Sequence, residues 1–145
     1  MVTATGADGP AGFLGLSTAH VCADPPTMLV SIDKRTSALA AVLEAQAFAI
    51  NYLAHDQQAI ADVFGGKGEA KGAARFADGS WTKLTTGAPV LAQAAGAIDC
   101  VLEETIERAG VVIALGRVVD FARSDRAPLV MLRGKYVSVA RNVTE

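Results

Sequence analysis

Two long segments rich in valine and isoleucine follow one another in the sequence: GAIDCVLEETIER at Gly96–Arg108 and GVVIALGRVVDFAR at Gly110–Arg123. β-Branched residues favour extended backbone, and the short Ala109-Gly110 step between the segments suits a hairpin turn. Successive residues of a strand point to opposite faces, and in the second segment both faces are largely apolar. We therefore predict two long antiparallel strands at the centre of a β-sheet.

Shorter strand signals precede this hairpin. Gly6–Pro10 has the glycine and proline content of a tight turn, which predicts a hairpin between Val2–Thr5 and Gly12–Cys22. Thr27–Asp33 has one uniformly apolar face and is predicted to be the next strand, and Phe48–Leu53 another. Two further short strands are expected near the end of the sequence, at Pro128–Met131 and Lys135–Val139.

Helical periodicity is confined to two short stretches. Apolar residues recur at helical spacing within Thr36–Ala45, where Thr36 or Ser37 suits the N-cap, and Gln57–Phe64 resembles a second short helix. Gly65–Gly87 is rich in glycine and charge and is predicted to be a long, partly helical connection, which in a compact domain is usually functional.

These elements amount to six or seven mostly antiparallel strands and one or two helices. A length of 145 residues suits a single domain over residues 1–145. Strands and helices do not alternate in a sustained way, which disfavours a doubly wound parallel sheet. Closure into a small barrel would remove the exposed sheet edges. We expect a mainly β (α+β) fold with a small antiparallel barrel and one or two short flanking helices.

The composition excludes several classes of protein. Hydrophobic residues make up 51% and charged residues 19%, so the chain is not intrinsically disordered. A formal net charge of −2 excludes a broadly basic nucleic-acid-binding protein. The longest apolar runs are far shorter than the ~20 residues that cross a bilayer, and Met1–Gly6 lacks the basic start of a secretion signal. We expect a cytoplasmic protein without membrane contact, and the apolar excess favours an oligomer.

Ser31–Ser37, with the sequence SIDKRTS, lies where a predicted strand passes into a predicted helix. Free N–H groups and the helix dipole attract anions at such a point, and two hydroxyls and two cations would complete a phosphate site. The alternative is a capped helix with solvated basic residues. Further along, Lys67, Lys71 and Arg75 recur every four residues and would share a helical face, either as a second cationic wall or as an ordinary solvated surface.

Other reactive residue types give no recognisable site. Cys22 and Cys100 are predicted to be buried apolar residues, because their spacing fits neither a disulfide framework nor a metal site. His20 and His55 have no apparent acid–base partner, and the sequence contains no Gly-x-Ser-x-Gly motif of a serine nucleophile. We identify no metal ligand and no catalytic residue.

A series of short motifs resembles the flavin reductase-like, FMN-binding split-barrel family, and the resemblance covers nearly the whole chain. The motifs follow in the family's order: Gly12-Phe13, Asp24-Pro25-Pro26, Asp33–Ser37, Asn51-Tyr52-Leu53, Phe64–Gly68, Trp81, Gly87–Leu91 and Arg133–Tyr136. The resemblance implies a six-stranded antiparallel, Greek-key split β-barrel that is normally a homodimer. It also implies noncovalently bound FMN or FAD, NADH or NADPH as hydride donor, and a partner monooxygenase that receives reduced flavin.

The resemblance also implies which residues contact the flavin. Four would lie along the isoalloxazine ring: Leu14, Gly15, Leu16 and Ser17. Three would flank the ribityl chain, namely Ser31, Ile32 and Asp33, and three would lie near the phosphate, namely Lys34, Thr36 and Ser37. Phe64 and Lys67 would approach from the following loop.

The chain also departs from the family's pattern. Leu14–Ser17 stands where relatives commonly have Thr-Ala-Ser-Ser, and Val111 stands where a histidine is often associated with the reductase site. The family's usual N-terminal helix has no counterpart before the first predicted strand. A flavin reductase is the leading hypothesis, and an FMN-binding protein without reductase turnover is the alternative. A third possibility is a barrel that binds haem or another phosphorylated cofactor, or that acts only as a dimeric scaffold.

Overall fold

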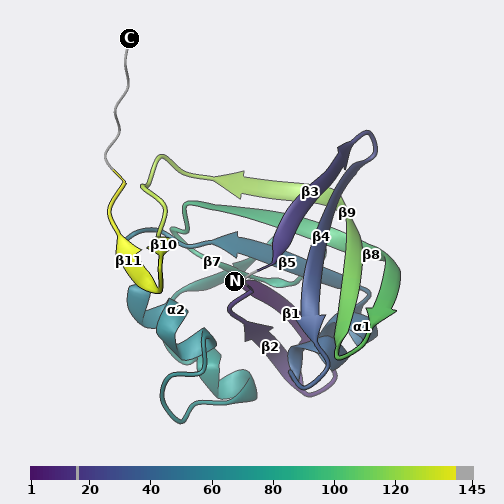
Figure 1. Ribbon diagram of the computed structural model, residues 1–145, viewed down its shortest axis with the longest axis horizontal. Coiled ribbons are helices and arrows are strands. Elements are labelled where there is room, and N and C mark those ends of the chain that lie inside the picture. The colour runs from purple at the N-terminus through teal and green to yellow at the C-terminus, as the bar shows by residue number, and fades with distance from the viewer. Residues whose placement is uncertain (16, 140–145) are drawn as a thin grey trace.

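The two long segments predicted as a hairpin form the longest strand pair of the fold. The computed structural model describes residues 1–15 and 17–139 (Figure 1). Strand β8 (Gly96–Arg108) pairs antiparallel with β9 (Val111–Arg123), which confirms the prediction. The pair lies inside a seven-stranded sheet with the order β2-β1-β5-β8-β9-β4-β3. The other strands of this sheet are β1 (Val2–Gly6), β2 (Gly9–Phe13), β3 (Thr18–Ala23), β4 (Pro26–Asp33) and β5 (Ala47–Tyr52).

The prediction of one continuous strand over Gly12–Cys22 is wrong, because this segment divides into β2 and β3. The Leu14 N–H donates to the Phe64 carbonyl at 3.0 Å, so the chain leaves the sheet after Phe13. Strands β2 and β3 lie at opposite edges of the sheet, yet only residues 14–17 join them. At 3.8 Å per residue this connection spans at most about 19 Å, so the sheet must curve until its two edges approach. The main sheet contains seven strands, where the family resemblance implies six.

The helices are close to their predicted positions, and two small ribbons complete the fold. Helix α1 (Ala38–Ala45) follows β4, and α2 (Gln58–Phe64) follows β5. Helix α1 packs against β1 and β2, and in Figure 1 α2 lies beside the C-terminal ribbon. The ribbons are β6 (Trp81–Lys83) with β7 (Pro89–Leu91), and β10 (Val130–Leu132) with β11 (Lys135–Val137). In the part of the chain described, neither α-helix is long and apolar enough to span a lipid bilayer.

The predicted helical face of Lys67, Lys71 and Arg75 does not form. Only the 3₁₀-helix η1 (Gly72–Phe76) is helical in this segment. Gly66 and Gly68 have φ values of 89° and 86°, which lie outside the right-handed helical region and interrupt it. Arg75 instead turns inward and donates from its guanidinium to the Gly12 carbonyl at 3.2 Å. The connection is thus tied to β2 rather than displayed as a cationic wall.

The main core fills the space between the curved sheet and α1. Phe48, Ile32 and Val42 are fully buried there and represent β5, β4 and α1. Phe48 lies under β9 at Gly116, where a methyl group would come within 2.5 Å of the Phe48 ring and 2.8 Å of the Cys100 Cβ. The absence of a side chain at Gly116 therefore lets the ring reach the centre of the sheet.

We predict that Gly116→Ala destabilises the protein by about 1–3 kcal/mol, because neither an aromatic ring nor a Cβ can move aside cheaply. The matched control is Gly110→Ala, where an added methyl group meets no atom within 4 Å and φ is outside the left-handed region. Urea unfolding monitored by circular dichroism measures both variants. Equal midpoints for the two variants would contradict this packing.

Candidate functional site

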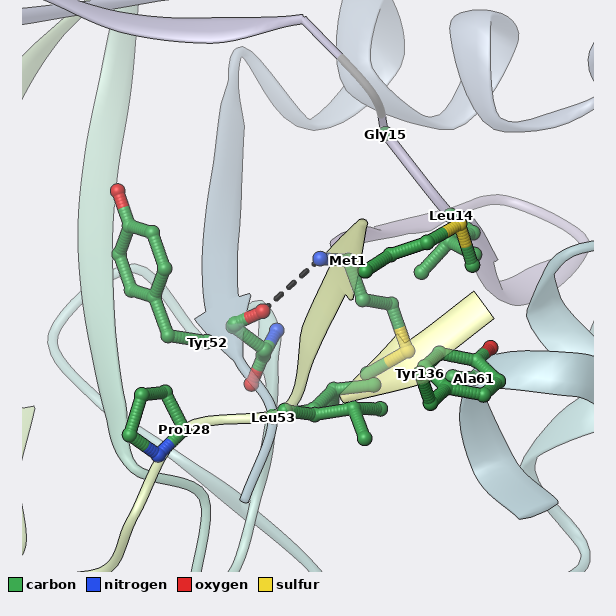
Figure 2. A pocket seen from close by; sticks show the side chains of 11 residues that line it. Met1, Leu14, Gly15, Tyr52, Leu53, Ala61, Pro128 and Tyr136 are labelled. Atoms are coloured by element: carbon green, nitrogen blue, oxygen red, sulfur yellow. Dashed lines mark hydrogen bonds between the residues drawn. The ribbon is translucent and has the colours of Figure 1, made fainter. Parts of the chain in front are cut away.

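A mostly apolar pocket of about 210 Å³ opens where β5 ends, between the β2–β3 connection, α2 and the C-terminal ribbon (Figure 2). Its walls come from segments far apart in the sequence, so the curvature of the sheet assembles it. The lining residues are Met1, Leu14, Gly15, Asn51, Tyr52, Leu53, Ala61, Pro128, Leu129, Met131 and Tyr136.

Asn51 anchors the base of the pocket through its buried amide. Its Oδ1 accepts the Leu91 N–H at 2.8 Å, and its Nδ2 donates to the Thr3 hydroxyl at 3.1 Å. Thr3 in turn donates to the Pro89 carbonyl at 2.5 Å. The Asn51 carbonyl accepts from the Met1 nitrogen at 2.9 Å (Figure 2). These bonds join β1, β5 and β7, so the end of β5 that carries Tyr52 and Leu53 is held rigidly.

The β10–β11 ribbon and the residues before it form a second wall. The Leu129 N–H donates to the Leu53 carbonyl at 2.7 Å, which continues the pairing beyond β5. Tyr136 lies at the other end of this wall, and its hydroxyl donates to Asp62 Oδ1 on α2 at 3.0 Å. Lys67 Nζ donates to the same carboxylate oxygen at 2.9 Å. The three side chains therefore tie the ribbon to α2 and to the loop that follows it.

This three-residue cluster changes the acid–base properties of its members. The hydrogen bond from Lys67 lowers the pKa of Asp62, and the bond from Tyr136 acts in the same direction. Burial raises the pKa of Tyr136, and its hydrogen bond to the Asp62 carboxylate raises it further. At neutral pH the cluster holds an ionised Asp62 and a neutral Tyr136.

Two of the four predicted ring-side residues, Leu14 and Gly15, line this pocket. Ser17 is exposed and is not among the lining residues, and Leu16 lies outside the described residues. Phe64, also predicted, supports the connection through its carbonyl. Its buried ring packs 5.0 Å from Phe76 and 5.7 Å from Trp81, measured between ring centroids, so it reaches the connection from behind rather than lining the pocket.

The predicted phosphate turn follows β4 and is linked to the pocket through the backbone. The Ser31 N–H donates to the Ser17 carbonyl at 3.0 Å, and β3 begins beside this bond. Ile32 is fully buried in the core, so only its main chain can contact a ligand. Ser31 and Asp33 are half-buried and alternate with it along the strand. The Ser31–Ser17 hydrogen bond therefore ties β4, two residues before its end, to the last residue of the β2–β3 connection.

The cations of the turn are engaged in exposed ion pairs. Lys34 Nζ lies 2.5 Å from Glu107 Oε2, and the side chain of Arg35 binds the carboxylate of Asp33 at 2.7–3.0 Å. The hydrogen bonds from Arg35 lower the pKa of Asp33 to about 2. The hydrogen bond from Lys34 likewise lowers the pKa of Glu107.

The hydroxyls of the turn are only weakly engaged. The Thr36 hydroxyl accepts the Ala38 N–H at 3.4 Å, and Ser37, at the N-cap, makes no side-chain cap bond. The α1 N-terminus thus has exposed serine and lysine side chains beside it, a donor set that suits a phosphate. Of the predicted residues, Leu14 and Gly15 lie at the pocket, and Lys34, Thr36 and Ser37 lie together at the turn.

Sequence reasoning missed the other half of the pocket. Tyr52 and Tyr136 occur in two of the quoted motifs, Asn51-Tyr52-Leu53 and Arg133–Tyr136, which were the available signal, but no role was assigned to them. Leu129 and Met131 had no signal, because only the tertiary fold brings them to β5. Lys67 reaches the site indirectly, through Asp62 and Tyr136.

The remaining candidate residues lie elsewhere. His20 and His55 are exposed, and neither lines the pocket. Cys100 is buried as expected, and burial raises the pKa of its thiol to about 12, whereas Cys22 is only half-buried and its thiol donates to the Pro25 carbonyl. Among residues 1–15 and 17–139, no group of three or more histidine, cysteine or acidic side chains could hold a metal ion.

Comparison with known proteins finds close similarity. Residues 1–140 match the model of a family described as "Flavin reductase like domain". An FMN reductase (NADH) RutF from Bradyrhizobium diazoefficiens is 39% identical over 106 residues, which are 73% of this chain and 58% of that protein. The chain therefore spans little more than half the length of this relative.

Two solved structures are similar over nearly the whole chain. One, from Haemophilus somnus, is described provisionally as a flavin reductase; it has a TM-score of 0.89 and 30% identity over 95% of this chain and 88% of that one. The other is BorF, the flavin reductase component of a bacterial two-component tryptophan halogenase, with a TM-score of 0.85 and 28% identity over 95% of this chain and 87% of that one.

We predict that the pKa of Tyr136 can be isolated by spectrophotometric titration. The chain has two tyrosines, so Tyr52→Phe leaves one phenol, which should ionise above the ordinary value of about 10. Asp62→Asn should move this ionisation to lower pH, because it removes the carboxylate that favours the neutral phenol. The contribution of the Tyr136–Asp62 contact to the free energy of unfolding is fully present below pH 10, and it is lost as the pH rises through the pKa of Tyr136 in the folded state. An ionisation that Asp62→Asn leaves unmoved would contradict the assigned contact.

Proposed function

Because the chain belongs to the flavin reductase-like domain family, we propose that it is a flavin reductase that transfers a hydride from NADH or NADPH to FMN or FAD. NADH and FMN are the favoured pair, since they are named for the Bradyrhizobium relative. The observation that carries the proposal is an apolar pocket lined by Leu14 and Gly15 together with an anion-accepting turn at Lys34–Ser37. The Ser17–Ser31 hydrogen bond ties the β2–β3 connection to the strand that leads into this turn. A flavin mononucleotide has the same two-part character, an apolar tricyclic ring and a charged phosphate.

The proposed ring site uses shape rather than charge. Leu14, Leu53 and Leu129 provide apolar surfaces. Gly15 would contribute main-chain atoms, and a side chain at this position would meet Val2 and Phe13. Leu16 and Ser17 are proposed to continue this edge, with Ser17 contributing main-chain and hydroxyl groups.

The proposed ribityl and phosphate contacts lie along the end of β4 and the turn after it. Ser31, the main chain of Ile32 and Asp33 would flank the ribityl chain. Lys34, Thr36 and Ser37 would hold the phosphate, with the first N–H groups of α1 as further donors. Phe64 and Lys67 would act from the loop side, Phe64 by supporting Leu14 and Lys67 through Asp62. All twelve residues remain proposals for the flavin site.

The proposed mechanism requires little acid–base catalysis by the side chains of this protein. Bound flavin supplies the hydride-accepting ring, so the protein has to bind it, orient it and keep water from one face. The rigid end of β5 and the ribbon wall provide that orientation, and stacking of a nicotinamide against a fixed ring accelerates transfer by proximity. We assign no catalytic acid or base.

We also propose that the protein acts as a homodimer. A pocket of about 210 Å³ is smaller than the roughly 300–1,000 Å³ of typical ligand pockets, so a second copy would complete the enclosure. The exposed lining residues Tyr52 and Met131, with the exposed Leu132 next to Met131 in the chain, support this arrangement. Each subunit would form a Greek-key split barrel from the seven-stranded sheet, with residues 1–145 as one domain.

The proposed physiological role is the supply of reduced flavin to a partner monooxygenase. BorF, at 28% identity, is the reductase component of a two-component system, although its partner is a halogenase. Dependence on a nicotinamide donor is the reason for proposing a cytoplasmic setting.

We predict that the purified protein oxidises NADH only when FMN or FAD is added, which the loss of nicotinamide absorbance measures. The absence of a flavin-dependent rate with either NADH or NADPH would refute the proposed activity. Leu14 and Val111 stand where the family resemblance implies polar residues, and they favour one second candidate, a flavin-binding protein without turnover. Tight FMN binding with no response to either nicotinamide would establish that candidate instead.

We predict that Thr36→Ala combined with Ser37→Ala weakens FMN binding at least roughly tenfold and riboflavin binding little, because only FMN carries the phosphate. Ser37→Ala alone avoids disturbing the Thr36–Ala38 contact and should act in the same direction. Thr105→Ala, at an exposed position on β8, is the control. Quenching of flavin fluorescence gives both dissociation constants. An equal loss for the two ligands would show that the phosphate lies elsewhere.

A further inference from the structure

Among the side chains that line the pocket and carry nitrogen or oxygen, only that of Tyr52 makes no hydrogen bond within the described residues. Three lining residues have such side chains: Asn51, Tyr52 and Tyr136. The amide of Asn51 is hydrogen-bonded to Thr3 and Leu91, and the hydroxyl of Tyr136 donates to Asp62. Within residues 1–15 and 17–139, the Tyr52 hydroxyl has no hydrogen-bond partner.

The position of Tyr52 on β5 aims its ring at the mouth of the pocket rather than into the core. Asn51 and Leu53, on either side, are 1% and 7% exposed, whereas Tyr52 is 42% exposed. Its cross-strand partner is Gly96, which has no side chain to cover the ring. In Figure 2, Tyr52 and Tyr136 stand on opposite sides of the pocket. The ring therefore forms a wall with a free face and a free donor, held on a rigid strand end.

A tyrosine hydroxyl without a protein partner at a pocket mouth costs little free energy as long as water can hydrogen-bond to it. The same hydroxyl needs a partner once a ligand displaces that water, because a buried phenol without one is unfavourable. A ligand that covers Tyr52 should thus offer two things: a flat surface for the ring and an acceptor for its O–H.

Resting on the proposed function, we propose that Tyr52 is a specificity-determining residue that binds the carbonyl-bearing heteroaromatic ring of the redox pair. Its ring packs against the ligand ring, and its hydroxyl donates to a carbonyl oxygen. The isoalloxazine and the nicotinamide carboxamide share this chemistry. Tyr136 takes no such role, because its hydroxyl already serves Asp62.

The test separates the hydroxyl from the ring and the flavin from the nicotinamide. Tyr52→Phe removes only the donor, and Tyr52→Leu also removes the aromatic surface. Phe121→Leu is the matched control, since Phe121 is a 66% exposed aromatic residue that lines none of the described pockets. The dissociation constant for riboflavin, which lacks the phosphate, reports ring contacts without turnover, and KM and kcat for NADH report the nicotinamide.

If Tyr52 contacts the flavin, Tyr52→Phe raises the riboflavin dissociation constant about two- to tenfold, and Tyr52→Leu raises it further. If it contacts the nicotinamide, the same ordered increase is found in KM for NADH, while riboflavin binding is unchanged. Either ordered series, with Phe121→Leu at the wild-type values, supports the proposal.

The proposal would be overturned if the wild type reduces flavin but neither Tyr52 variant changes the riboflavin dissociation constant or KM for NADH. The proposed function would remain intact in that case. A Tyr52→Leu effect without any Tyr52→Phe effect would overturn the hydroxyl contact. Failure of the wild type to bind riboflavin and to oxidise NADH would overturn both the inference and the proposed function.

Discussion

The fold and its pocket depend on the short crossing between the two edges of the main sheet. Residues 14–17 must run from the end of β2 to the start of β3, which are opposite edges in the strand order. So short a connection forces the sheet to curve, and curvature is what brings β5, α2 and the C-terminal ribbon around one cavity. Backbone bonds fix the crossing at both ends, to Phe64 on one side and Ser31 on the other. The segment that closes the sheet is therefore also the edge of the proposed flavin site.

The sequence predicted those parts of the fold that local patterns determine. Two thirteen-residue strands joined by a short turn satisfy strand propensity along their whole length, so β8 and β9 are recognisable without any neighbour. The division of Gly12–Cys22 could not be foreseen in the same way, because it depends on where Phe64 lies, about 50 residues later. Strands β6 and β7 have three residues each, and only their pairing with each other makes them strands.

The same distinction holds for the candidate site. Ser31–Ser37 is contiguous, and its combination of strand end, hydroxyls, cations and helix start is visible in the sequence. The pocket, in contrast, is assembled from positions as distant as Leu14, Tyr52 and Tyr136, and no periodicity relates them. Ile32 shows a further limit: the motif gives its position, while burial in the core restricts it to main-chain contacts.

The two parts of the candidate site differ in how firmly their polar groups are held: the turn after β4 has exposed ion pairs, and the pocket has a buried, fully hydrogen-bonded asparagine. At the turn, the Lys34–Glu107 and Arg35–Asp33 pairs are exposed, and exposed ion pairs contribute little to stability. Lys34 can therefore move from Glu107 to a phosphate at a small cost in free energy, which suits the proposed binding and release of flavin. At the pocket, Asn51 is fully buried and fully paired, so its strand cannot shift without leaving polar groups unsatisfied. A ligand anchored loosely by charge at one end and positioned by a rigid strand at the other can exchange between turnovers and still bind in one orientation.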